Sequence, residues 1–275
     1  MKNLKIILLF VAIYANSYAQ KLPEKQETGL WKPADVKIDG NADAWINNMQ
    51  AYNKTVEVYY SLANDDQNLY LFLWTQKPRI IEKLLGGGLS FTINNQGKKE
   101  AASANNIVIT YPVFKSKLRS TVRGIIINAG DQAVFYREYM NYSPAYRSIL
   151  IEHLTRTDST VSIANNTFNA GAKEIKIQGI REIPDTLISV YNDQQIKTGA
   201  TFRADGSYIY EVSIPIKFIR PLIGDSPKFS YSIRINVFDK QGYFTDPVDH
   251  QYKVTDPDFV SSSEFWATYT LAKKP

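Results

Sequence analysis

The sequence contains no cysteine and only two histidines, His153 and His250. Without cysteine, the chain has no disulfides, no thiolate metal ligands and no cysteine nucleophile. Neither histidine has a partner at the spacing of a zinc site, and no Ser, His and Asp set lies in a recognisable catalytic motif. The sequence therefore gives no support to an enzyme, and we expect a protein without catalytic activity.

Beyond its first residues, the sequence has no long apolar run. Residues 1–19 begin with positive charge at Lys2 and Lys5, continue with a short apolar stretch and end with small residues. This pattern predicts a signal peptide that is cleaved before Gln20, and no transmembrane anchor in the mature chain. Because exported eukaryotic domains commonly carry disulfides, the missing cysteine favours a bacterial periplasm, cell surface or extracellular location.

The sequence also lacks a long block of like charge. Its formal net charge is +5, and removal of Lys2 and Lys5 with the predicted signal peptide leaves +3. Proteins that bind nucleic acids gather their basic residues on one face or along one helix, whereas acidic and basic residues are interspersed here. We therefore expect no nucleic-acid partner.

What the sequence does contain is a repeated alternation of side chains with a period of two, which is typical of strands. Residues 56–62 have an apolar face and a more polar face. Residues 69–74 are apolar on both faces, which predicts a central strand or one whose aromatic face is covered. Further strands are expected at 89–94, 107–111, 124–128, 174–179, 208–214, 229–238 and 266–271. Many short strands between turns predict an all-β fold, an antiparallel two-sheet sandwich of the jelly-roll or immunoglobulin-like kind.

Helical signals are few. Residues 78–85 predict one short helix, with a proline near its start and three glycines, 86–88, at its end. We interpret the stretch at about 130–170 as a short, partly helical insertion. Residues 20–33 form a polar leader, and 34–275 are expected to form a single domain.

The four tryptophans are the first candidates for a ligand site, because sugar rings stack on flat aromatic faces and bond their hydroxyls to polar side chains nearby. Trp74 lies at an expected strand end near Arg79 and on the same face as Tyr70, although packing in the core or under a lid is the alternative. Trp266 alternates with threonines on a polar face. Our predicted ligand contacts are Trp74, Trp266, Tyr70 and Arg79. Trp45 follows a turn and is expected to close one end of the sandwich as part of the core.

Acidic residues give a second kind of candidate. Asp39 and Asp43 lie in a segment of alternating carboxylates and amides, but Gln50 stands where an EF-hand has its closing glutamate. Asp65 and Asp66 are typical of a hairpin turn. We expect no cofactor, and a structural calcium ion at these aspartates is the alternative.

Three segments resemble family 9 carbohydrate-binding modules. Lys37 to Trp45 (KIDGNADAW) resembles the opening of that family, Asn64 to Leu71 (NDDQNLYL) resembles its early two-strand unit, and Tyr210 to Pro215 (YEVSIP) resembles its late strand. Ile81 to Phe91 is similar to uncharacterised exported proteins of Bacteroidetes-type bacteria. The resemblance implies a fold of two antiparallel sheets and, as in many members, a bound calcium ion. It assigns no sugar site to particular residues.

The leading hypothesis is an exported, non-catalytic protein that binds a glycan weakly through exposed aromatic side chains. The alternative is a structural or assembly protein of the cell envelope that binds another protein through its aromatic surface and the insertion. A third hypothesis, taken from related sandwiches, is a haem-binding redox protein in which Met49, Met140, His153 or His250 ligates the iron.

Overall fold

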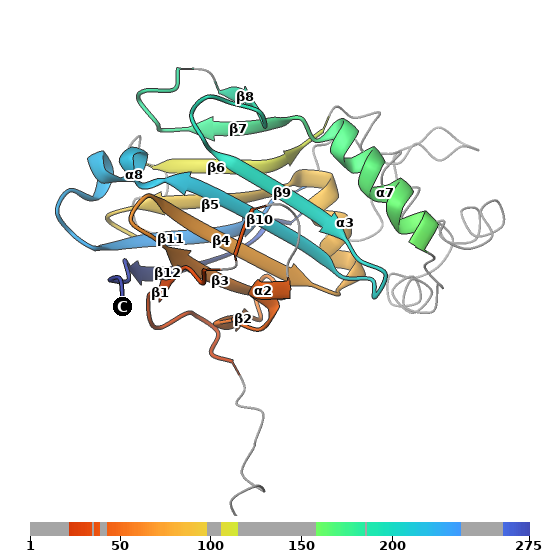
Figure 1. Ribbon diagram of the computed structural model, residues 1–275, viewed down its shortest axis with the longest axis horizontal. Coiled ribbons are helices and arrows are strands. Elements are labelled where there is room, and N and C mark those ends of the chain that lie inside the picture. The colour runs from red at the N-terminus through yellow and green to blue at the C-terminus, as the bar shows by residue number, and fades with distance from the viewer. Residues whose placement is uncertain are drawn as a thin grey trace, which may run out of the picture.

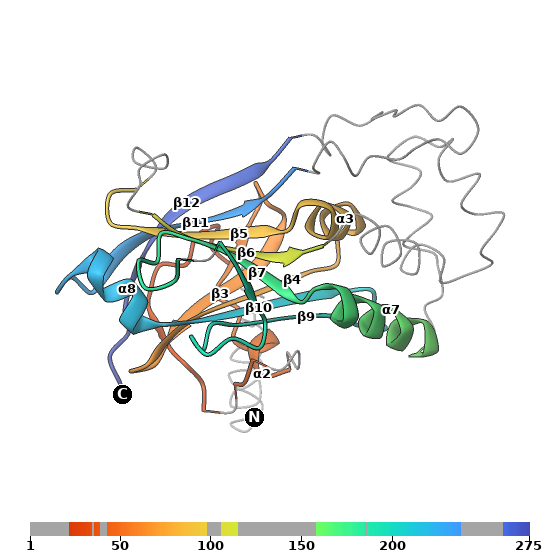
Figure 2. The ribbon, with the colours of Figure 1, turned by 90° about the horizontal axis from the view of Figure 1, so that it is seen from above.

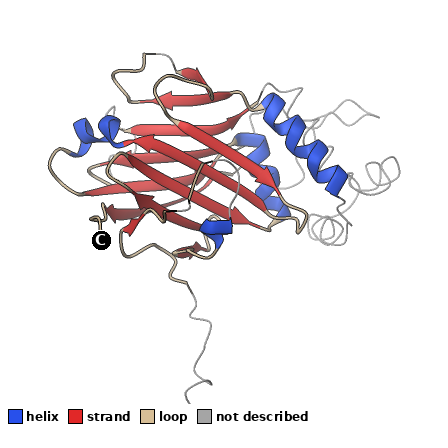
Figure 3. Ribbon diagram, in the orientation of Figure 1, coloured by secondary structure: helices blue, strands red, loops and turns tan. Residues whose placement is uncertain are grey.

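The structure is a computed structural model that describes residues 22–34, 36–38, 43–97, 106–114, 158–184, 186–237 and 261–275. Two six-stranded sheets lie face to face in it (Figures 1, 2 and 3). The predicted all-β sandwich is therefore confirmed. Among the helices in these ranges, none is long and apolar enough to cross a membrane.

The first sheet, sheet A, has the strand order β1-β3-β4-β10-β9, and β2 also pairs with β3. Its strands are β1 (Leu30–Trp31), β2 (Ala51–Asn53), β3 (Val58–Asn64), β4 (Asn68–Thr75), β9 (Lys197–Phe202) and β10 (Tyr208–Pro215). The pairs are antiparallel except for β1 with β3.

The second sheet, sheet B, has the strand order β12-β11-β5-β6-β7-β8. Its strands are β5 (Leu89–Asn94), β6 (Ile107–Val113), β7 (Glu174–Gln178), β8 (Leu187–Ser189), β11 (Lys228–Ile235) and β12 (Ser263–Thr270). Every pair in this sheet is antiparallel.

Short helices lie around the two sheets. They are α2 (Asp43–Ile46), α3 (Pro78–Gly87), α7 (Asp158–Gly171) and α8 (Ile216–Ile223). In Figure 2, α2 lies on the outer side of sheet A, α8 lies at one end of the sandwich, and α3 and α7 lie at the opposite end.

The predicted elements that fall in the described ranges are observed. Of the expected strands, only 124–128 lies outside these ranges. The helix expected at 78–85 is α3, which runs to Gly87. Gly88 ends it with a φ of 74°, a left-handed conformation that favours glycine, and a Cβ there would lie 2.6 Å from the carbonyl oxygen of Pro112.

Other predictions lie outside the described residues. These are the signal peptide at 1–19 and most of the insertion expected at 130–170. The end of that stretch forms α7, and its Phe168 is fully buried against the core. Export therefore stays a prediction.

The core between the sheets is rich in aromatic rings, and a hydrogen bond joins the two sheets within it. Its largest fully buried side chains include Tyr60, Phe91, Tyr210, Tyr231 and Phe229. The hydroxyls of Tyr60 and Tyr231, from β3 and β11, lie 3.0 Å apart. The backbone N–H of Gln26 also donates to the Tyr60 hydroxyl, at 3.0 Å, so these buried polar atoms satisfy one another.

Sheet A is buried on its outer face as well. Strand β4 carries Tyr70, Phe72 and Trp74 on that face, and Trp45 of α2 stacks on Phe72 with ring centroids 5.4 Å apart. Ile209 of β10 belongs to the same cluster. The prediction of a central strand with a covered aromatic face is confirmed. Trp45 is fully buried, as expected, but it covers sheet A instead of closing the end of the sandwich, because the outward ring of Phe72 needs an apolar neighbour.

The unpaired hydroxyl of Tyr210 gives a test of this core. Tyr210 is fully buried, its hydroxyl has no hydrogen-bond partner in the part of the chain that the structure describes, and burial raises its pKa. We predict that Tyr210→Phe leaves the free energy of unfolding unchanged or raises it by up to about 1 kcal/mol, because an unpaired buried hydroxyl loses its hydration without compensation. Tyr60→Phe removes the same atom from a paired position and should lower stability by about 1–2 kcal/mol.

Urea unfolding of the two variants and of the parent protein measures these differences in the free energy of unfolding. A loss of stability in Tyr210→Phe equal to that in Tyr60→Phe would show that the Tyr210 hydroxyl has a partner, such as a buried water, and would contradict the prediction.

Candidate functional site

Sheet B differs from sheet A because its outer face is polar. In β11, Tyr231 and Ile233 are buried in the core, while Ser230, Ser232 and Arg234 alternate with them on the other face. Strands β5 and β7 alternate in the same way. Among the described elements, none covers this face as α2 covers sheet A (Figure 2).

The strand register aligns the outward side chains of five strands into two rows. The first row, from β12 to β7, is Glu264, Arg234, Ser90, Thr110 and Lys176. The second row, in the same order of strands, is Trp266, Ser232, Thr92, Val108 and Gln178. Because neighbouring strands lie about 4.8 Å apart, each row is roughly 19 Å long.

A groove of about 490 Å³ lies over the two rows, and we call it the sheet B groove. It is lined by all residues of both rows except Ser232, together with Asn236 and a rim of Gly87, Pro112 and Val113. Its volume falls in the range of pockets that hold small ligands or parts of larger ones.

One end of the groove floor is held by hydrogen bonds between its own side chains. The hydroxyls of Ser90 and Thr110 lie 2.8 Å apart. The amide Nδ2 of Asn236 donates to Ser90 Oγ and to the carbonyl oxygen of Gly87, each at 3.0 Å. These polar atoms are fixed before any ligand arrives, which lowers the entropy that binding loses.

The charged side chains of the groove are bonded to neutral partners or are free. The hydroxyl of Ser232 donates to Glu264 Oε1 at 3.0 Å, and Arg234 Nη2 donates to Ser262 Oγ at 2.9 Å. The two ion pairs found among the described residues lie elsewhere. Lys176 is exposed and carries its charge into solvent.

Trp266 is the aromatic side chain of the groove. It is partly buried on β12, beside polar neighbours. Its indole Nε1 is buried and has no hydrogen-bond partner within the described part of the chain. The Nε1 atoms of Trp45 and Trp74 are in the same state, so the unpaired N–H does not single out Trp266, whereas its partly exposed ring lines the groove. An aromatic ring among polar side chains suits a ligand rich in hydroxyl groups.

Trp74 lies on the outer face of sheet A, so the two predicted tryptophans are on opposite faces of the sandwich and cannot form one site. Its cross-strand neighbours are Tyr59 and Ile209. The rings of Trp74 and Tyr59 have centroids 5.0 Å apart, and Tyr52 continues the row at 4.6 Å from Tyr59. The Nε1 of Trp74 also lacks a partner among the described residues, but its ring lies against apolar and aromatic side chains.

The polar atoms of the other two predicted contacts already have partners. Tyr70 shares the outer face of β4 with Trp74, is 8% exposed and donates its hydroxyl to Asp65 Oδ2 at 2.7 Å. Burial, and then the nearby carboxylate of Asp65, raises the pKa of the Tyr70 hydroxyl well above its usual value. Arg79 pairs with Glu57 at 2.5 Å.

The calcium candidates do not form a cluster in the described residues. Asp39 lies outside them, Asp43 begins α2, and Asp66 is exposed in the turn after Asp65. No group of three or more His, Asp or Glu side chains in these ranges could hold a metal ion. Structural calcium therefore stays a prediction.

Only one haem candidate lies in the described residues. Met49 is half-buried, with its sulfur 4.0 Å from the Ser61 hydroxyl on the outer side of sheet A. Met140, His153 and His250 fall outside the described ranges. A haem site remains untested.

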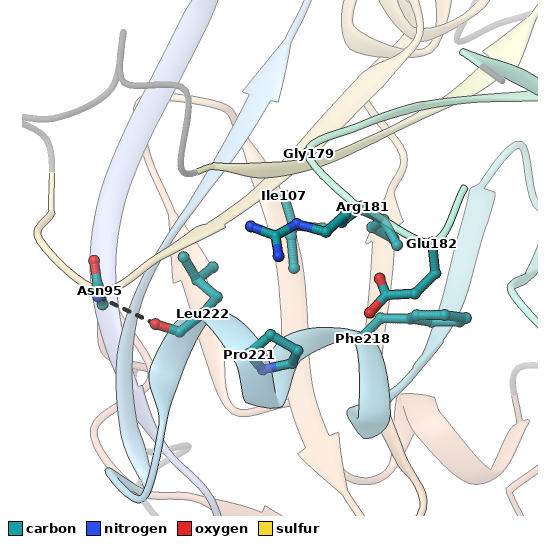
Figure 4. Close-up of a pocket in the computed structure, with 9 residues that line it drawn as sticks. Asn95, Ile107, Gly179, Arg181, Glu182, Phe218, Pro221 and Leu222 are labelled. Atoms are coloured by element: carbon teal, nitrogen blue, oxygen red, sulfur yellow. Dashed lines mark hydrogen bonds between the residues drawn. The ribbon is translucent and has the colours of Figure 1, made fainter. Parts of the chain in front are cut away.

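A second pocket, of about 590 Å³, lies beside α8 (Figure 4). Arg181 and Glu182, which follow β7, line it together with Phe218 of α8, and Asn95 Nδ2 donates to the carbonyl oxygen of Leu222 at 3.1 Å. Because Phe218 is only 7% exposed, this pocket offers no aromatic face of the size of Trp266. We therefore take the sheet B groove as the candidate site.

Sequence reasoning named Trp266 as a candidate, which stays a prediction, and did not name the polar residues that share its groove. The alternation in 174–179 and 229–238 could indicate that Lys176, Gln178 and Arg234 face outward. That signal does not say that β7 and β11 belong to one sheet.

Comparisons with known proteins find little. No protein-family model matches this chain, and no curated protein gives a significant match. One similar solved structure is a family 9 carbohydrate-binding module from Caldicellulosiruptor kristjanssonii in complex with glucose. It is 9% identical with a TM-score of 0.39, over 90% of this chain and 96% of that one. A similarity of this size assigns no ligand and no site to this chain.

The turn at Asp65 gives a test of the role of its carboxylate. Asp65 Oδ1 accepts the backbone N–H groups of Gln67 and Asn68, each at 2.8 Å, and Oδ2 accepts the Tyr70 hydroxyl. We predict that Asp65→Ala lowers the free energy of unfolding by about 1–3 kcal/mol, because three donors lose their acceptor. Asp66→Ala, at the exposed neighbour, should change it by less than about 0.5 kcal/mol.

Thermal and urea unfolding of the parent protein and both variants measure these changes in stability. A chelator in the buffer removes any bound calcium from the comparison. Equal effects of the two substitutions would contradict the structural role of Asp65.

Proposed function

We propose that this protein binds an oligosaccharide or polysaccharide chain in the sheet B groove and catalyses no reaction on it. The observation that carries the proposal is Trp266, whose incompletely buried indole ring lies in a row of polar side chains and lines the groove. Ligands with alternating apolar ring faces and hydroxyl groups match both properties.

Each part of such a ligand has a counterpart in the groove. The C–H face of a sugar ring stacks on the indole of Trp266. Gln178, at the other end of the second row, is exposed and has an amide that both donates and accepts. Between them, Thr92 supplies a further hydroxyl to the lining.

The shape of the groove favours a chain over a single sugar. The rows cross five strands and span roughly 19 Å, which is longer than one sugar ring. The expected export of the protein would bring it to glycans outside the cytoplasm.

The charged residues of the groove support binding without hydrolysis. Glycoside hydrolysis generally uses two carboxyl groups that face each other across the scissile bond. Among the described residues, the lining of the groove includes one carboxylate, Glu264, and it accepts a hydrogen bond from Ser232.

The test compares two tryptophan substitutions. A glycan array and soluble polysaccharides identify a ligand, and titration calorimetry and tryptophan fluorescence measure its affinity. We predict that Trp266→Ala weakens binding roughly tenfold or more, because the stacking surface is lost. Trp74→Ala, on the opposite sheet, should leave the affinity unchanged.

Circular dichroism and thermal unfolding establish that both variants are folded. Unchanged affinity in Trp266→Ala, or a loss confined to Trp74→Ala, would contradict the site. A parent protein that binds no glycan would contradict the function.

A further inference from the structure

We infer that the glycan is an acidic polysaccharide, a polymer of sugars that carry carboxylate groups, and that Lys176 and Arg234 bind those carboxylates. This inference rests on the proposed glycan binding and adds the class of glycan. It comes from the distribution of charge along the first row of the groove.

Among the described residues, three charged side chains line the sheet B groove, and two of them are positive. Arg234 and Lys176 lie in the first row on β11 and β7, and Glu264 lies at the β12 end of the same row. Both cations are exposed, whereas Glu264 is partly buried. The accessible charge of this described lining is therefore positive.

Neither cation is neutralised within the described part of the chain. Glu264 stands directly opposite Arg234 in the register, where side chains of opposite charge usually attract. Yet Glu264 Oε1 accepts the Ser232 hydroxyl and Arg234 Nη2 donates to Ser262 Oγ, and the two do not form an ion pair. Lys176 has no carboxylate directly opposite it, since its register partners are Thr110 on β6 and Leu187 on β8.

The distance between the cations indicates a polymeric ligand. Three strand steps separate β11 from β7, which places Arg234 and Lys176 roughly 14 Å apart along the row. This spacing separates the backbone positions, and a chain with a carboxylate on each of several sugars can contact both cations at once. The hydroxyls of Ser90 and Thr110 lie between the two cations and suit the uncharged groups of the same chain.

The guanidinium of Arg234 can bind a carboxylate of an acidic sugar in a bidentate arrangement. Its planar fork matches the planar carboxylate and can form two parallel hydrogen bonds with it. Such pairs at an exposed site are individually weak, so selectivity for an acidic chain requires the repeated contacts that the groove provides.

The test uses two polymers with the same backbone, polygalacturonate and its fully methyl-esterified form. We predict that the protein binds polygalacturonate roughly tenfold more tightly at low ionic strength, and that added sodium chloride removes this preference. Dextran sulfate serves as a polyanion that lacks carboxylates and should bind more weakly than polygalacturonate.

Single substitutions connect the preference to the groove. Lys176→Gln and Arg234→Gln should each weaken polygalacturonate binding roughly threefold and leave binding of the esterified polymer unchanged. Glu264→Gln, which keeps an acceptor for Ser232, should strengthen polygalacturonate binding by a similar factor. Lys197→Gln removes an exposed positive charge from sheet A and is the matched control, with no expected effect.

The outcomes separate this inference from the proposed function. Equal affinity for the two polymers, with binding still lost in Trp266→Ala, would overturn the acidic ligand and leave glycan binding in place. A preference for dextran sulfate, or an effect of Lys197→Gln as large as that of Lys176→Gln, would also overturn it. Failure to bind any glycan would overturn both proposals.

Discussion

Sheet A has two apolar faces. The need to remove both faces from water determines the arrangement of much of the remaining chain. Its inner face packs on sheet B, but the outward ring of Phe72 requires a separate cover. The segment around α2 supplies that cover, and Trp45 stacks on Phe72. A tryptophan that is fully buried in this way stabilises the fold and is lost as a binding surface.

Sheet B needs no such cover, and its outer face carries the sheet B groove. Its strands alternate, with Tyr231 and Ile233 inside and Ser232 and Arg234 on the outer face, so its outer side is already compatible with water. The difference between the sheets follows from the side chains alone, since antiparallel sheets can expose one polar face. The two tryptophans therefore have different surroundings: Trp74 lies against apolar and aromatic side chains, and Trp266 lies among polar ones.

The sequence predicts the strands well, because alternation is local, but it does not predict how the groove assembles. Strand β9 (Lys197–Phe202) is missed since its glycine and threonines give a weak pattern, and α8 is missed since Pro215 before it suggests only a turn. Lys176 and Arg234 are brought into one row by the strand order β11-β5-β6-β7. That order depends on which strands pair across long loops, and periodicity contains no information about it.

What distinguishes the sheet B groove from an ordinary solvated sheet face is a large aromatic ring among its polar side chains. The ring of Trp266 is only partly buried and lines the groove, whereas Trp45 is fully buried against sheet A. Ser90, Thr110 and Asn236, which line the same groove, are bonded to one another and are held in place without a ligand. Under the proposed function, the aromatic ring and these fixed polar groups contact the uncharged parts of a glycan. The charged side chains that line the described part of the groove are predominantly positive, which is why the proposed ligand carries negative charge.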